Sequence, residues 1–267
     1  MTPILSPDAF AQLLASNDDV VLLDARAFGY DEGHLRGAQR ADLETQLSAA
    51  RDPGANPKHG GRHPLPPLDR WLAQLGEWGI GPETHVVIYD DQFGANAAAR
   101  AWWMLRAVGH ERVSVLEDAL TLPMTTDVPE ITPRPPYPAS SWQRPTVDMA
   151  RVDELRRDPD WKVLDVRSRE RFLGKIEPID PIAGSIEGAV NLPFAENLEN
   201  GRFKSPEALR AMYDELLDGT PPERLVVHCG SGVTACHTLL ALEAAGLEGP
   251  SLYVGSWGEW CRNNTIT

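Results

Sequence analysis

A cysteine on a glycine-rich turn is the strongest chemical feature of this sequence. Cys229 follows the apolar run 225–228 and opens the segment CGSGVT, which leads into an apolar helical stretch. The two glycines, Gly230 and Gly232, let the backbone curl so that several N–H groups point inward at the positive end of that helix. N–H groups and a helix N-terminus both favour the thiolate, so a thiol placed there ionises easily. The segment therefore predicts a nucleophilic cysteine with an anionic reaction partner.

Cys229 has three alternative interpretations. It could be a buried structural thiol beside an ordinary turn. It could be a zinc ligand, with His228, Cys236 and His237, but structural zinc ligands recur within about two to five residues, whereas six residues separate the two cysteines here. A cysteine phosphatase needs an arginine six positions after the cysteine, and Ala235 stands there. We therefore expect no metal and no phosphatase chemistry.

The composition of the chain restricts the classes of partner that it can bind. The chain has 267 residues with 39 acidic and 25 basic side chains, a net charge of −14, which argues against nucleic acid. No run approaches the roughly 18 apolar residues of a membrane span, and residues 1–15 do not resemble a secretory signal. Three cysteines are too few for a disulfide framework. We expect a soluble, cytoplasmic protein with no membrane partner.

The sequence contains an internal repeat. Four markers recur in the same order: VVLLDARAF (20–28) and WKVLDVRSR (161–169), GHLRGA (33–38) and GSIEGA (184–189), HVVIYD (85–90) and RLVVHC (224–229), AVGHERVSVL (107–116) and AAGLEGPSLYV (244–254). Between the copies, residues 123–145 contain seven prolines, which favour an extended connector. The predicted organisation is a first domain at 1–122, a linker at 123–145 and a second domain at 146–267.

Each copy alternates short aliphatic runs with helical stretches. The predicted strands are 20–23, 86–89, 113–116, 163–165, 225–228 and 252–254. The predicted helices include 97–108 and 234–245, the second ending at Gly246, and one that begins after Ser6 as N-cap. This alternation predicts an α/β fold with a mainly parallel sheet and flanking helices in each copy. Ligands bind beyond the carboxyl ends of such strands, where Cys229 falls.

Several segments together resemble the two-domain rhodanese family, and within it the 3-mercaptopyruvate sulfurtransferases. They are CGSGVT (229–234), ERFLG (170–174), GSWGEW (255–260) and the duplication with cysteine only in the second copy. The resemblance implies two tandem rhodanese-like domains, the first inactive because Asp90 stands where Cys229 stands in the second. It implies that Cys229 takes sulfur from a small-molecule donor, forms a persulfide, and passes the sulfur to cyanide, a low-molecular-weight thiol or thioredoxin. It implies no cofactor.

The resemblance also implies roles for the residues around Cys229. Relatives that prefer the dianion thiosulfate carry basic side chains just after the cysteine, whereas Gly230 and Ser231 are small and neutral and suit monoanionic mercaptopyruvate. Ser231, His63 and Glu44 stand where the family has a proton relay. His63 lies in the loop 51–67, in which 8 of 17 residues are glycine or proline, and a loop of that length is usually functional or disordered. The alternative is a surface histidine.

The resemblance assigns recognition of the donor to an arginine and to the cysteine loop. Arg171 aligns with the family's substrate arginine, and its planar fork matches a carboxylate. The alternative is an ion pair with Glu170 or Glu177. Many members carry a second arginine about nine residues later, where this chain has Asp180, and Lys175 is a candidate substitute. The loop residues expected to bind negative charge are Gly230, Gly232, Val233 and Thr234.

Other residues receive structural interpretations. Arg26 and Arg167 each follow a strand aspartate and are expected to brace it. Cys236 is expected to be a buried hydrophobe, with a resolving thiol as the alternative, and Cys261 is expected to be exposed. Two rival functions remain: a thiosulfate sulfurtransferase of the same fold, and a non-catalytic module that only relays persulfide.

Overall fold

The chain forms two compact units. The computed structural model describes residues 2–16 and 19–264. Unit 1 spans Met1–Ser48 and Pro66–Gln143, and unit 2 spans Ala49–Leu65 and Arg144–Thr267. The segment 49–65, which the sequence analysis counts within the first domain, therefore packs with the second unit.

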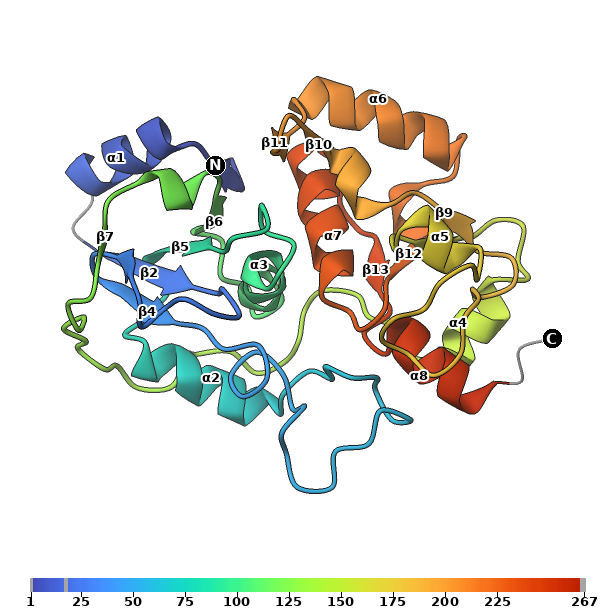
Figure 1. Cartoon of the computed structure of the whole chain (residues 1–267), viewed down its shortest axis with the longest axis horizontal. Coiled ribbons are helices and arrows are strands. Elements are labelled where there is room, and N and C mark those ends of the chain that lie inside the picture. Colours follow the sequence, from blue (N-terminus) through green and yellow to red (C-terminus); the bar gives the residue numbers. More distant parts are fainter. Residues whose placement is uncertain (1, 17–18, 265–267) are drawn as a thin grey trace. The chain divides into compact units, whose positions relative to one another are not determined.

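Unit 1 is built on a parallel five-stranded sheet. Its order is β1 (Ile4–Leu5), β6 (Val113–Leu116), β5 (His85–Tyr89), β2 (Val20–Asp24) and β4 (Ala38–Arg40). The helices are α1 (Pro7–Ser16), α2 (Leu68–Glu77) and α3 (Ala98–Arg106) (Figure 1). Phe10 of α1 packs with Val87 and Tyr89 on one face. The alternate residues Val86 and Ile88 point to the opposite face and are also fully buried, so both faces are covered.

Unit 2 repeats the design with four parallel strands. Their order is β13 (Ser251–Leu252), β12 (Leu225–His228), β8 (Lys162–Asp165) and β9 (Val190–Asn191). The helices are α4 (Met149–Leu155), α5 (Arg169–Phe172), α6 (Pro206–Leu217), α7 (Thr234–Ala244) and α8 (Ser256–Asn263). Residues of α4 and α8 form one core with Val163 and Val226. In Figure 1, α6 and α7 lie on the other side of this sheet.

Smaller elements complete both units. Two antiparallel ribbons pair β3 (His34–Leu35) with β7 (Met124–Thr125) and β10 (Leu198–Glu199) with β11 (Arg202–Phe203). Three 3-10 turns cover Ala119–Thr121, Phe194–Asn197 and Pro222–Arg224. The predicted linker includes β7 and the buried Tyr137, whose N–H donates to Leu72 O at 2.9 Å. No helix in the described ranges has the length and apolar character needed to cross a membrane.

The repeat is visible in the bracing of each sheet. Asp24 ends β2 and accepts from Arg26, whose Nη2 also donates to Gly33 O. Asp165 ends β8 and accepts from Arg167, whose Nη2 donates to Gly184 O at 2.8 Å. The bracing role predicted for both arginines is confirmed. In each unit the arginine thus donates to the carbonyl oxygen of an equivalent glycine, Gly33 or Gly184, which is the arrangement expected of a duplication.

Candidate active site

Cys229 lies at the carboxyl end of β12, where the chain turns into α7. Its side chain is buried, and the Ser231 N–H points at Sγ from 3.5 Å. Burial by itself raises the pKa of this thiol, but hydrogen-bond donors outweigh burial, and the pKa lies below that of an ordinary cysteine. The donors are the hydroxyl of Thr234 and the N–H groups of Ser231, Ala235 and Val233. The loop therefore stabilises a thiolate.

The first turn of α8 holds this loop in place. The first N–H groups of a helix have no partner within it and must bind elsewhere. Here the N–H of Trp257 donates to Cys229 O at 3.0 Å, and that of Gly258 donates to Gly230 O at 2.9 Å. Because α8 binds these two carbonyl oxygens, the loop keeps its N–H groups turned toward the sulfur.

Ser256 connects the same helix to Cys229, and the sequence analysis did not single it out. Its Oγ accepts from the Cys229 N–H at 3.1 Å, donates to Tyr253 O at 2.9 Å and lies 4.0 Å from Cys229 Sγ. The residue adopts φ +55°, which is uncommon for a non-glycine residue. The available signal was the GSWGEW segment, where the serine follows a glycine.

The equivalent turn in unit 1 contains a carboxylate. Asp90 follows β5, and its side chain is buried. Its two carboxylate oxygens accept five backbone N–H bonds of 2.8–3.1 Å, from Gln92, Gly94, Asn96, Ala97 and Ala98. Burial raises the pKa of Asp90 more than these donors lower it, but the turn still directs its N–H groups at one side chain, which is the task expected of the loop around Cys229.

The two loop glycines are needed for different reasons. Gly232 has φ +72°, and a Cβ on it would lie 2.6 Å from Val254 O. A Cβ on Gly230 would lie 2.9 Å from Arg62 Nη2 and 3.3 Å from Arg171 Nη2. Gly232 allows the turn, whereas Gly230 leaves room for two guanidinium groups beside the residue that follows the cysteine.

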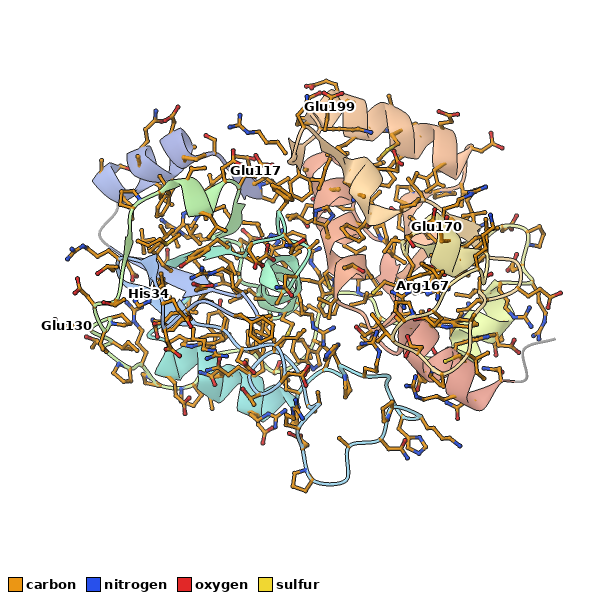
Figure 2. The ribbon with its side chains drawn as sticks, in the orientation of Figure 1. His34, Glu117, Glu130, Arg167, Glu170 and Glu199 are labelled. Carbon is orange, nitrogen blue, oxygen red and sulfur yellow. The ribbon has the colours of Figure 1, made fainter. Side chains whose placement is uncertain are left out.

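Arg171 serves an ion pair and also borders the loop. Its Nη2 and Nε contact the carboxylate of Glu177 at 2.7 and 3.1 Å, so the predicted alternative partner is present. Burial raises the pKa of Glu177, but Arg171 and backbone donors lower it below its usual value. Glu170, the other candidate partner, lies exposed on α5 (Figure 2).

Asp180 and Arg62 explain the departure from the family's pattern. Asp180 is buried and accepts from Arg62 Nε at 3.1 Å and from Arg262 Nη1 at 2.8 Å. Lys175 is exposed. The second guanidinium beside Gly230 is therefore that of Arg62, which sequence reasoning missed. The only signal was its place next to His63 in a glycine- and proline-rich loop.

The three residues aligned with a proton relay fall in different units. Ser231 is buried in the cysteine loop, and His63 is half-buried in the segment 49–65 of the same unit. That segment is held to α8 by the Gly60 N–H, which donates to Glu259 Oε1 at 2.7 Å. Glu44 belongs to unit 1, where its N–H donates to Asp42 Oδ1 at 3.0 Å. The structure thus places Ser231 and His63 in one unit and Glu44 in the other.

The remaining cysteines are buried and form no disulfide among the described residues. Cys236 donates to Gly232 O at 3.3 Å from inside α7. The expectation that Cys261 is exposed was wrong, because α8 packs its inner face into the core of unit 2. Burial raises the pKa of Cys261 above its ordinary value. Among the described residues, no three His, Cys, Asp or Glu side chains are arranged to hold a metal ion.

Comparison with known proteins gives matches over most of the chain. The model of the rhodanese-like domain matches twice, at residues 6–121 and 148–263. A probable 3-mercaptopyruvate sulfurtransferase of Pseudomonas aeruginosa is 40% identical over 94% of this chain and 93% of its own length. A thiosulfate sulfurtransferase of Mus musculus is 34% identical over 87% and 79%. The structure of 3-mercaptopyruvate sulfurtransferase from Leishmania major superposes with a TM-score of 0.80 and 30% identity, over 97% of this chain and 74% of that one.

Proposed function

Because this chain belongs to the rhodanese family and is a sulfurtransferase, we propose that it moves a sulfane sulfur from 3-mercaptopyruvate to a thiol or cyanide through a persulfide on Cys229. The observation that carries the proposal is the buried Cys229 thiol with a lowered pKa, in a loop whose next residue, Gly230, is bordered by two arginine side chains. A thiolate supplies the nucleophile, and arginine supplies recognition of an anionic donor.

The transfer occurs in two balanced steps. The Cys229 thiolate attacks the donor sulfur, an S–S bond forms, and the C–S bond breaks with its electron pair left on C3 of pyruvate. The proton of the donor thiol ends on C3, so pyruvate leaves and Cys229 carries the persulfide anion. Cyanide or a thiol then attacks the outer sulfur and releases thiocyanate or a new persulfide together with the Cys229 thiolate. The loop N–H groups stabilise the sulfur anion throughout.

The donor's thiol proton needs a route to C3. Ser231, His63 and Glu44 are the residues we propose for it, with the serine next to the reacting sulfur and the histidine as the group that titrates near neutral pH. Ser231 lies within the cysteine loop, and His63 follows Arg62, which reaches the same loop. Replacing Ser231 by alanine should lower kcat while leaving the alkylation of Cys229 by iodoacetamide unchanged.

The charge of the site favours a monoanionic donor. Four arginines and three carboxylates form one connected group, which leaves a single positive charge. The members are Arg62, Arg167, Arg171, Arg262, Asp165, Glu177 and Asp180. This positive charge offsets the Cys229 thiolate, so the site repels a 2-oxo acid with one carboxylate less than it repels the dianion thiosulfate.

Thiosulfate remains the second candidate donor, since relatives of that name are also similar to this chain. The test is kcat/KM for 3-mercaptopyruvate and for thiosulfate, with cyanide as acceptor, on the wild type and Cys229→Ser. A preference for mercaptopyruvate that is lost in the variant supports the proposal. A preference for thiosulfate would make the protein a rhodanese in the narrow sense, and no turnover of either would favour the relay module. Three cysteines without a disulfide among the described residues are consistent with a reducing compartment, and we propose the cytoplasm.

A further inference from the structure

The guanidinium of Arg62 reaches the nucleophile's loop from a distant part of the sequence. Arg62 belongs to the segment 49–65, which packs with unit 2. Its Nη2 lies 2.9 Å from the place where Gly230 would carry a Cβ, nearer than any atom of Arg171. Gly230 is the residue directly after Cys229, so Arg62 borders the space in which a donor bound to Cys229 must lie.

The two arginines differ in which of their guanidinium N–H groups already have a partner. Arg171 uses Nε and Nη2 on the carboxylate of Glu177, which occupies one full edge of its fork. Arg62 uses only Nε, on Asp180 Oδ1 at 3.1 Å, among the residues that the structure describes. Its side chain is 22% exposed, whereas that of Asp180 is fully buried. Arg62 therefore keeps both Nη groups for a ligand.

Asp180 fixes the direction of this fork. It also accepts from Arg262 Nη1 at 2.8 Å, so the carboxylate is held from the side of α8 while it holds Arg62. A guanidinium anchored through Nε presents its two Nη groups in one plane, the arrangement that binds two oxygens of a carboxylate.

We propose that Arg62 is the specificity-determining residue for the donor's carboxylate and that Asp180 is its positioning residue. This inference rests on the proposed function, because it names the residue that recognises the donor of that same site. The ligand class is a small monocarboxylate with a sulfur or other reactive atom within reach of Cys229.

The first experiment compares Arg62→Gln with Lys58→Gln, which removes the same charge from an exposed position of the same loop. Arg62→Gln should raise KM for 3-mercaptopyruvate by about 10- to 100-fold, the range expected for loss of a charge-assisted pair, and change kcat by less than about threefold. Arg62→Lys, which keeps the charge without the fork, should fall between. The Lys58 variant should match the wild type. An unchanged KM in Arg62→Gln, or an equal rise in both glutamine variants, overturns the proposal.

A second measurement does not depend on the physiological donor. Iodoacetate carries a carboxylate and iodoacetamide does not, so the ratio of their alkylation rates at Cys229 reports carboxylate recognition alone. Arg62→Gln should reduce this ratio by about tenfold, and Asp180→Asn should reduce it less. A wild-type ratio in Arg62→Gln together with a reduced ratio in Arg171→Gln would assign recognition to Arg171. If Arg62→Gln lowers the ratio of alkylation rates but the wild type does not turn over 3-mercaptopyruvate, the role proposed for Arg62 is supported and the proposed donor is wrong.

Discussion

At the scale of single residues, the chemistry depends on how a buried thiol is kept ionised. Burial of Cys229 opposes the thiolate, and the surrounding donors reverse that effect. One of them, Thr234, is the first residue of α7 and donates from its side chain. It can be changed without altering the backbone of the loop, which makes its contribution measurable.

We predict that Thr234→Val raises the pKa of Cys229, because the valine cannot donate to the thiolate. The measurement is the pH dependence of the rate of alkylation by iodoacetamide. The rate in Cys229→Ser is subtracted, because it reports alkylation of Cys236 and Cys261. The wild-type midpoint should lie below that of free cysteine, about 8.5, and the variant's midpoint should lie higher by roughly one unit. Thr234→Ser, which keeps the hydroxyl, is the control and should behave as the wild type. A wild-type midpoint at or above that of free cysteine would contradict this account of the site.

At the scale of elements, the predictable features were those with a local cause. Apolar runs predicted six strands of the two main sheets but missed the short β1, β4 and β9. Ser6 and Gly246 marked helix ends as expected: the Ala9 N–H donates to Ser6 Oγ at 3.2 Å, and Gly246 has φ +71°. The last strand was shorter than predicted, Ser251–Leu252 instead of 252–254.

Features with a tertiary cause were not predictable. The capping of the cysteine loop by α8 depends on how β12, α7 and α8 fold together. The positions of Arg62 and Ser256 likewise follow from contacts between segments far apart in the chain. Their residue types are ordinary, so a single sequence offers no periodicity or spacing that distinguishes them.

The two glycines of the loop provide a test at this scale. Gly232→Ala should lower the free energy of unfolding by about 1–3 kcal/mol, because it combines a positive φ with a clash against a backbone oxygen. Gly230→Ala should cost far less stability, since its Cβ meets only the ends of two arginine side chains. Urea denaturation of both variants gives the comparison. Equal losses of stability would show that the turn is not as the structure describes it.

At the scale of the whole molecule, the chain passes from unit 1 into unit 2 and back. The segment 49–65 contributes Arg62 and the Gly60 contact to unit 2 before the chain returns to unit 1 at Pro66. The catalytic loop of unit 2 is therefore bordered by residues from the first half of the sequence. Duplication explains the two sheets, whereas this excursion is an addition that the repeat does not contain.

Stability of the whole molecule should depend on buried histidines. Burial, with smaller contributions from Arg112 and His110, lowers the pKa of His85 to about 4. The unfolded chain binds a proton near the ordinary pKa of about 6.5, so the unfolded state gains protons first as the pH falls. The contribution of neutral His85 to stability is thus present above pH ~6.5 and lost progressively toward pH ~4.

We therefore expect Tm to fall by several degrees between pH 7 and pH 5, and to fall less in His85→Gln, which does not titrate. His59→Gln, at an exposed position, should keep the wild-type slope. Calorimetry at a series of pH values tests this, and an identical slope in the wild type and His85→Gln would exclude His85 as a source of the acid sensitivity.

The central claim is that Cys229 accepts sulfur from a 2-oxo acid donor. The most direct measurement is the mass of the peptide that contains Cys229 after the protein meets 3-mercaptopyruvate without an acceptor, together with the pyruvate released. The account predicts that this peptide gains one sulfur atom, that pyruvate appears in equal amount, and that cyanide removes the sulfur as thiocyanate. Sulfur on Cys236 or Cys261 instead, or pyruvate release that continues in Cys229→Ser, would contradict it.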